Sequence, residues 1–299
     1  MDDRMTWLKE FPSLSGEALS ALRRGIDGAF RQFTRDHGET LELLFLPLRD
    51  FLIGSERVLT QTPWPVVMAA LAALAWLASR SWRITASVVL TLAAIGFFGM
   101  WEDTMKTMAI IFVATVVSLV VGLPIGILMS RSDRLQRVVT PMLDVMQTMP
   151  SFVYLIPVVM LLGIGRVPGL IAVVIYAIPP VIRFTNLGIR LVDKDLLEAA
   201  DAFGSSAWQK MRQVQIPLSL PTIMAGVNQT IMLSLAMVVI ASMIGVQGLG
   251  QPVLKAISNQ YFTMGMLNGL AIVGIAILLD RVSQAYGKRL QKHLEVVHG

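Results

Sequence analysis

The chain has 299 residues, of which 55% are hydrophobic and only 15% are charged, whereas about 25% of the residues in a typical soluble domain are charged. It has no cysteine and three histidines, all near the ends, which excludes disulfides and cysteine- or histidine-ligated metals in the apolar body. The net charge of +5 is more typical of topological charge bias in a membrane protein than of nucleic-acid binding, so we expect lipid and no nucleic acid around this chain.

Residues 1–62 form a mixed-charge N-terminal tail with ten acidic and eight basic residues. They contain no uninterrupted apolar stretch followed by a small-residue cleavage site, so we expect no cleaved signal peptide. Apolar residues recur at helical spacing over residues 14–35, which predicts an amphipathic helix. Residues 41–53 are too interrupted by Glu42, Pro47, Arg49 and Asp50 to cross a membrane. This segment either lies on the membrane surface or packs as a helix on the rest of the subunit.

Seven apolar stretches follow, and each approaches the ~20 residues that a helix needs to cross a bilayer. They predict an all-α integral membrane protein. Two accessory spans fall within residues 63–101, and a short tail follows at 285–299. Gly122, Pro124 and Gly126 are predicted to kink the third span, and Pro150 and Pro157 the fourth, or else to accommodate close packing. The predicted spans are 63–79, 84–101, 107–129, 143–164, 167–187, 222–245 and 262–282.

The distribution of lysine and arginine between the connections predicts the orientation. Alternate connections carry fourteen basic residues, and the remaining ones carry only Lys106, Arg166 and Lys255. Positively charged connections stay in the cytoplasm. The C-terminus and the connection at 188–221 are therefore predicted to be cytoplasmic, and the N-terminal tail is predicted to lie outside.

The cytoplasmic connection at 188–221 has a sequence typical of two short helices. Asp195 is predicted to cap the first helix, with Glu198 three residues later, and Gly204 to end it in the left-handed conformation. Ser206 is predicted to cap the second helix together with Gln209, and Pro217 and Pro221 are predicted to bound that helix. Small residues and Phe203 should then face solvent. A connector without any partner is the alternative.

The same connection resembles the EAA motif of ABC importer permeases. Glu198-Ala199-Ala200 is followed after three residues by Gly204 and, nine residues later, by Val-x-Ile-Pro where the family has Ile-x-Leu-Pro. The resemblance implies that the helix docks in a groove of a separate ATP-binding subunit. It implies a coupling role for six residues: Glu198, Ala199, Ala200, Gly204, Val214 and Pro217.

A wider resemblance covers residues 100 to 284. Thr148–Tyr154, Ile178–Arg183, Gly226–Thr230 and Gly248–Gly250 are similar to the glycine betaine/proline/choline permease family. The similarity implies a type I ABC importer permease core at 102–284, made of the last five spans. It also implies import of a quaternary ammonium solute such as choline, glycine betaine or proline betaine across a bacterial inner membrane.

The partners follow from the same resemblance: an extracytoplasmic binding protein, a second permease copy and two ATP-binding subunits. The chain lacks the G-x-x-x-x-G-K-[ST] phosphate loop, so ATP and magnesium are expected on the partner subunit. We expect no cofactor, no metal and no catalytic residue in this chain, which would be a translocation subunit rather than an enzyme. The alternatives are an amino-acid permease, for example for methionine, a stand-alone channel or ion-coupled carrier, and a membrane scaffold.

Candidates for the translocation pathway are few. A quaternary ammonium ion favours aromatic faces, which makes Phe152, Tyr154 and Tyr176 candidates, although such residues also serve as interfacial anchors. Asn228 and Gln229 either line the pathway or form hydrogen bonds between helices. Asp280 at the end of the last span either pairs with its neighbour Arg281 or marks the cytoplasmic boundary.

Overall fold

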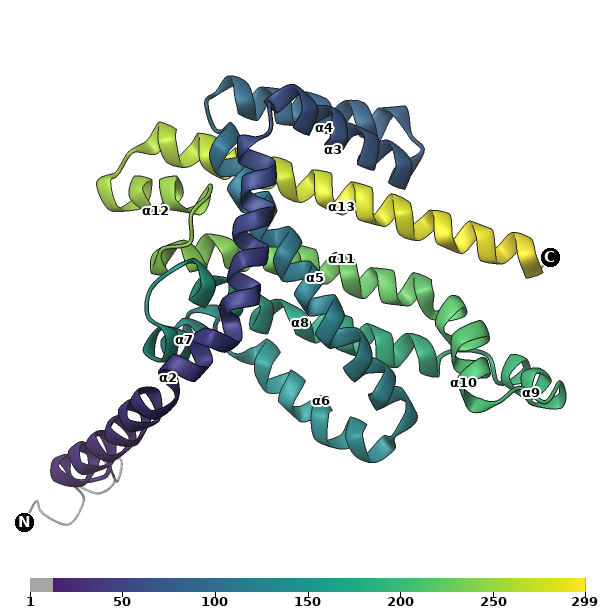
Figure 1. The fold of residues 1–299 in the computed structure, drawn as a ribbon, viewed down its shortest axis with the longest axis horizontal. Helices are drawn as coiled ribbons and strands as arrows, with labels where there is room; N and C mark the ends of the chain where they lie inside the picture. The colour runs from purple at the N-terminus through teal and green to yellow at the C-terminus, as the bar shows by residue number, and fades with distance from the viewer. Residues whose placement is uncertain (1–12, 299) are drawn as a thin grey trace, which may run out of the picture.

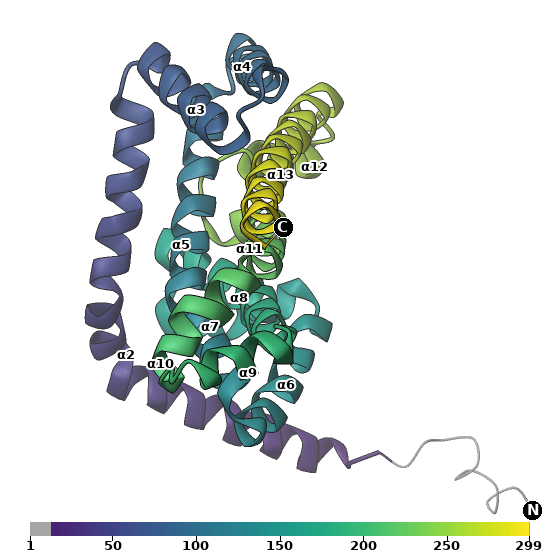
Figure 2. The same cartoon turned by 90° about the vertical axis from the view of Figure 1, so that its right-hand side faces the viewer.

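The computed structural model describes residues 13–298, and this part of the chain consists of helices joined by short turns. The first helix, α2 (Gly16–Gln61), contains both N-terminal segments that were predicted to be separate. Figure 2 shows α2 bending near its middle into two limbs. Pro47 explains the bend, because its ring displaces the carbonyl of Leu43 and it has no N–H to donate, and the straight limb Leu43–Gln61 begins there.

The second limb of α2 packs on the rest of the subunit, which was one of the two alternatives for this segment. Leu52 is buried in the main apolar core together with Ile110 and Ile111. Nearby, Arg166 Nη1 donates to Glu56 Oε2 at 2.8 Å, and the Glu56 side chain is only 13% exposed. The limb is therefore anchored by both apolar and ionic contacts.

The remaining chain folds into a layered helical bundle (Figure 1). A hairpin of two apolar helices precedes the long core helices, and a broken segment lies between the first two core helices. The elements are α3 (Trp64–Ser79), α4 (Trp82–Phe97), α5 (Trp101–Arg131), α6 (Asp133–Thr148), η1 (Ser151–Tyr154), α7 (Leu155–Leu162), α8 (Arg166–Arg190), α9 (Lys194–Ala202), α10 (Ala207–Lys210), η2 (Met211–Gln215), α11 (Ile216–Ala241), η3 (Ser242–Ile244), α12 (Gly250–Asn259) and α13 (Phe262–His298).

Within residues 13–298, four helical stretches are long and apolar enough to cross a membrane: Trp101–Arg131, Arg166–Arg190, Ala207–Ile244 and Phe262–Gln291. Two pairs qualify only when taken together: Leu43–Gln61 with Trp64–Ser79, bent by 111°, and Asp133–Thr148 with Ser151–Leu162, bent by 110°. The number of spans is six if each bent pair counts once. The seven predicted spans are therefore not all confirmed, because the fourth breaks beside Pro150 and α4 has only 16 residues.

Close contact between α5 and α8 explains the glycines of the third predicted span. A Cβ added to Gly122 would lie 2.4 Å from Val181 Cγ1, and one added to Gly126 would lie 2.6 Å from Thr185 Cβ. α5 remains one helix from Trp101 to Arg131 with Pro124 inside it. The glycines thus serve helix packing, the alternative to a kink, and small residues at helix contacts are the usual device in membranes.

α8 lies at the centre of the bundle, between α5 and α11, and α13 covers α11 on the side of the α3–α4 hairpin (Figures 1 and 2). Gly226 of α11 allows the second close approach, because a Cβ there would lie 2.7 Å from Phe184 Cβ. α8 is more buried than the other three long apolar stretches. Arg190 is its last residue, and α9 follows after a short turn.

Candidate functional site

Helix α9 begins two residues earlier than predicted. The side chain of Asp193 caps it by accepting a hydrogen bond from Asp195 N at 3.0 Å, so Asp195 lies in the first turn. The predicted cap at Asp195 with Glu198 as its partner is wrong. An acidic side chain in the first turn still complements the helix dipole, which explains why both carboxylates fit this end.

The turn that ends α9 has the predicted conformation. Gly204 adopts φ = +74°, its N–H donates to Asp201 O at 2.9 Å, and Ser205 N donates to Ala200 O at 3.0 Å. This pair of bonds forms a Schellman motif, in which the residue after the helix takes the left-handed conformation. The predicted glycine break is confirmed.

Helix α10 starts as predicted but does not end as predicted. Ser206 and Gln209 form a reciprocal capping box. The predicted boundary at Pro217 and Pro221 is wrong, because α10 passes through a π-helical turn, Met211–Gln215, directly into α11. The wider turn gives room for the ring of Pro217, which would otherwise strike the carbonyl four residues earlier.

The two short helices form one surface, which we call the α9–α10 surface (residues 194–210). Lys210 Nζ contacts both carboxylate oxygens of Asp201 at 2.6 and 2.7 Å, which holds α10 against α9. Phe203 is 92% exposed and Trp208 is 63% exposed. Large aromatic side chains at this exposure are typical of a surface that binds another protein rather than of a surface that faces only solvent.

Some of the predicted coupling residues are exposed on the α9–α10 surface, and the others are buried or half-buried next to it. The small residues Ala199 and Gly204 are exposed on it, as predicted, and so is Glu198. Ala200 is buried instead, and its carbonyl accepts the Ser205 N–H of the Schellman turn. Val214 and Pro217 are half-buried in the π-helical turn and the first turn of α11, beneath the surface.

The three aromatic pathway candidates do not form one cage. The rings of Tyr154 and Tyr176 meet edge to face, with centroids 5.7 Å apart. The hydroxyl of Tyr154 donates to the carbonyl of Met146 across the break between α6 and α7. Phe152 is exposed, whereas Tyr154 is buried. Tyr154 therefore links η1 to α6 on the other side of this break.

Asn228 forms hydrogen bonds between helices, one of the two alternatives proposed for it. Its Nδ2 donates to Asp280 Oδ1 at 2.9 Å, and Gln284 Nε2 donates to the same carboxylate at 2.8 and 2.9 Å. In the described part of the chain the partners of Asp280 are thus amides rather than Arg281. Gln229 is exposed one position further along α11.

Replacement of Asp280 by alanine is expected to lower the free energy of unfolding by about 1 kcal/mol, because it leaves Asn228 Nδ2 without its acceptor on α13 while Ser283 Oγ still donates to Asn228 Oδ1. Asp280→Asn keeps an acceptor oxygen for the same bond and is expected to lose less. Thermal unfolding of both variants in one detergent tests this. An equal loss in the two variants would assign the effect to the charge of Asp280 and not to the hydrogen bond.

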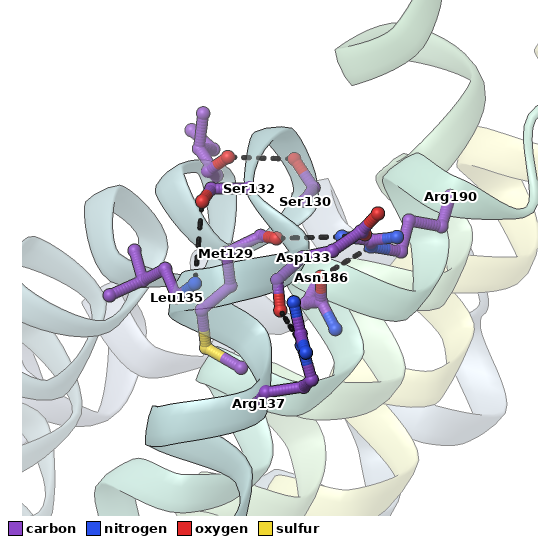
Figure 3. Close-up of polar contacts among 9 residues, drawn as sticks. Met129, Ser130, Ser132, Asp133, Leu135, Arg137, Asn186 and Arg190 are labelled. Atoms are coloured by element: carbon purple, nitrogen blue, oxygen red, sulfur yellow. Dashed lines mark hydrogen bonds and ion pairs between the residues drawn. The ribbon is translucent and has the colours of Figure 1, made fainter.

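A polar cluster joins the ends of α5, α6 and α8 (Figure 3). Arg190 Nη2 lies 2.7 Å from Asp133 Oδ1 and donates to Met129 O at 3.0 Å, and Arg190 Nε donates to Asn186 Oδ1 at 3.1 Å. In the sequence Arg190 had contributed only to the charge asymmetry between connections. Asn186 lies four positions before Arg190 on the same helix, but Met129 lies 61 positions earlier and Asp133 lies close to Met129, so local sequence signals do not reveal these two partners.

The comparisons with known proteins place the chain in a family. The model of the "Binding-protein-dependent transport system inner membrane component" family matches residues 118–295, more than half of the chain. The chain belongs to this family. It is therefore a multi-pass inner-membrane transport component.

Two curated relatives and one solved structure agree with this assignment. The glycine betaine/proline betaine transport system permease ProW of Escherichia coli strain K12 is 48% identical over 81% of this chain and 68% of its own length. The glycine betaine/carnitine transport permease GbuB of Listeria monocytogenes is 45% identical over 76% of this chain and 81% of its own length. A structure of the inward-facing MetNI methionine ABC transporter has a TM-score of 0.57 at 21% identity, over 62% of this chain and 93% of that chain. The last likeness confirms the all-α ABC permease fold.

Proposed function

We propose that the chain is the permease subunit of an ATP-driven importer of quaternary ammonium solutes such as glycine betaine, proline betaine or choline. The observation that carries this proposal is the identity of 48% and 45% to two betaine permeases over about three quarters of the chain or more. The likeness to the methionine transporter is only 21% identical and supports the fold alone, so it does not favour an amino-acid substrate.

The α9–α10 surface is the proposed docking site for a separate ATP-binding subunit, on which ATP and magnesium would bind. Support comes from its exposed Phe203 and Trp208 and from the rigid Schellman turn at Gly204. Glu198 and Ala199 would contact the ATP-binding subunit directly. Ala200, Val214 and Pro217 would not contact the ATP-binding subunit but would hold the exposed residues of the surface in place.

The proposed assembly has two copies of the permease, two ATP-binding subunits and an extracytoplasmic binding protein. In the proposed orientation α9 and the C-terminus are cytoplasmic and the N-terminal tail is outside. The excess of lysine and arginine on the connections that share a side with α9 supports this orientation.

Uptake into proteoliposomes tests the function. The chain is reconstituted with its ATP-binding subunit and binding protein, and uptake of glycine betaine, proline betaine, choline and methionine is compared. We expect ATP-dependent accumulation of one or more of the quaternary ammonium solutes and none of methionine. The chain reconstituted alone should accumulate none of them. Accumulation without the ATP-binding subunit would instead identify an ion-coupled carrier, and selective uptake of methionine would identify an amino-acid permease.

A further inference from the structure

One arginine joins three helices immediately before the proposed docking surface. Arg190 is the last residue of α8, three positions before Asp193, which caps α9. Its guanidinium contacts a carbonyl in the last turns of α5, a carboxylate in the first turn of α6 and an amide on α8 itself (Figure 3). α9 is thus separated by only a short turn from a side chain that holds the α5–α6 corner.

The chemistry of this contact requires arginine. The guanidinium presents donors in a rigid planar fork, whereas lysine offers one flexible point charge. The Met129 carbonyl lies in the last turns of α5, where the helix dipole is negative and attracts a cation. The Arg190 side chain is 32% exposed and Met129 is buried, whereas the Asp133 side chain is 78% exposed, so solvent screens the ion pair with Asp133 more than the bond to the Met129 carbonyl.

A second ion pair joins the same two helices further from the corner. Arg183 lies two helical turns before Arg190 on α8, and its Nη2 contacts Asp144 Oδ1 near the other end of α6. α6 is therefore fastened to α8 at two points. A helix held at both ends by a well-packed neighbour follows the displacement of that neighbour as a rigid element.

We infer that Arg190 is a positioning residue for transport, which fastens the α5–α6 corner to the end of α8 so that displacement of α9 moves α6 as well. The inference rests on the proposed function of the α9–α10 surface. It adds a specific mechanical contact: force applied to α9 reaches α6 through the guanidinium and its partners Asp133 and Met129.

The first test measures the attachment itself and needs neither solute nor ATP. The chain has no native cysteine, so Arg134→Cys on α6 and Ala202→Cys on α9 provide unique sites for spin labels in lipid nanodiscs. We expect a narrow distance distribution in the parent chain and a broader or shifted one in Arg190→Gln and in Asp133→Asn. An unchanged distribution in both variants would overturn the inference.

Arg137→Gln is the matched control for charge. Arg137 is exposed on α6 and its Nε donates to the Asp133 carbonyl of its own helix, so the variant removes one positive charge without touching α8. It should leave the distance distribution unchanged. A change as large as that of Arg190→Gln would assign the effect to net charge and would also overturn the inference.

The second test measures coupling in the full complex. Asp133→Asn alters a side chain that is 78% exposed and should leave the melting temperature unchanged, while the solute imported per ATP hydrolysed falls about fivefold or more. Arg190→Lys keeps the positive charge but loses the planar fork. This variant should therefore retain only part of the parent's ratio of solute imported to ATP hydrolysed. A proportional loss of hydrolysis, uptake and melting temperature would indicate a purely structural role and refute the inference.

Absence of ATP-dependent uptake by the parent complex would instead refute the proposed function. In that case the distances between the spin labels still decide whether Arg190 fastens the α5–α6 corner to α8.

Discussion

Gly204→Val is expected to reduce solute uptake about tenfold while the permease still inserts and folds. Gly204 has φ = +74°, and a side chain in the left-handed region costs about 1–2 kcal/mol, which corresponds to about tenfold in an equilibrium constant. A Cβ added there meets no atom within 4 Å, so the effect is backbone strain alone. The strain opposes the Schellman turn and reorients α9 relative to α10. Uptake and ATP hydrolysis by the reconstituted complex measure the result, and hydrolysis should fall less than uptake.

Gly99→Val is the matched control for that strain. Gly99 has φ = +77° and also has no atom within 4 Å of an added Cβ, but it lies in the turn between α4 and α5. It should carry the same local strain and leave the ratio of uptake to ATP hydrolysis unchanged. If both variants lost coupling equally, the α9–α10 surface would have no special role.

Gly126→Ala is expected to destabilise the bundle by about 1–3 kcal/mol, the usual effect of overpacking a tightly packed contact. The added Cβ would lie 2.6 Å from Thr185 Cβ and 2.8 Å from the Ile182 carbonyl oxygen. The second neighbour is backbone and cannot rotate away, so α5 and α8 must separate. Thermal unfolding in detergent, with the yield of folded protein, measures the loss.

Gly269→Ala provides the comparison in another helix. Gly269 lies within α13, and a Cβ added there meets nothing within 4 Å. Alanine exceeds glycine in helix propensity by up to ~1 kcal/mol, so this variant should unfold at the same or a higher temperature. A similar loss of stability in both variants would mean that the α5–α8 contact is not the reason for glycine at position 126.

The local chemistry of the α9–α10 surface could be predicted from sequence because it depends on neighbours in the chain. The left-handed turn at Gly204 and the capping box of Ser206 with Gln209 both formed as predicted. The cap of α9 was misassigned by two residues because Asp193 and Asp195 are both acceptable caps. The choice between them depends on where α8 ends, and α8 ends beside its contact with the α5–α6 corner.

The helix boundary predicted at Pro217 and Pro221 was wrong because a proline can stay inside a helix when the preceding turn widens. A π-helical turn shifts the carbonyls so that the ring of Pro217 fits. The chain accordingly keeps its helix through the turn Met211–Gln215 and continues directly into α11. The proline alone does not show whether a chain leaves the helix or widens it.

The membrane character, the helical composition and the Gly204 turn could be predicted because they depend on composition and on hydrogen bonds between near neighbours, and the resemblance to betaine permeases followed from short motifs. The anchoring of the second limb of α2, the glycines at helix contacts and the partners of Arg190 became visible only in the packed structure. Glu56 meets Arg166 across 110 positions and Arg190 meets Met129 across 61. Such partners are selected by the packing of whole helices, and the chain between them carries no local signal of the contact.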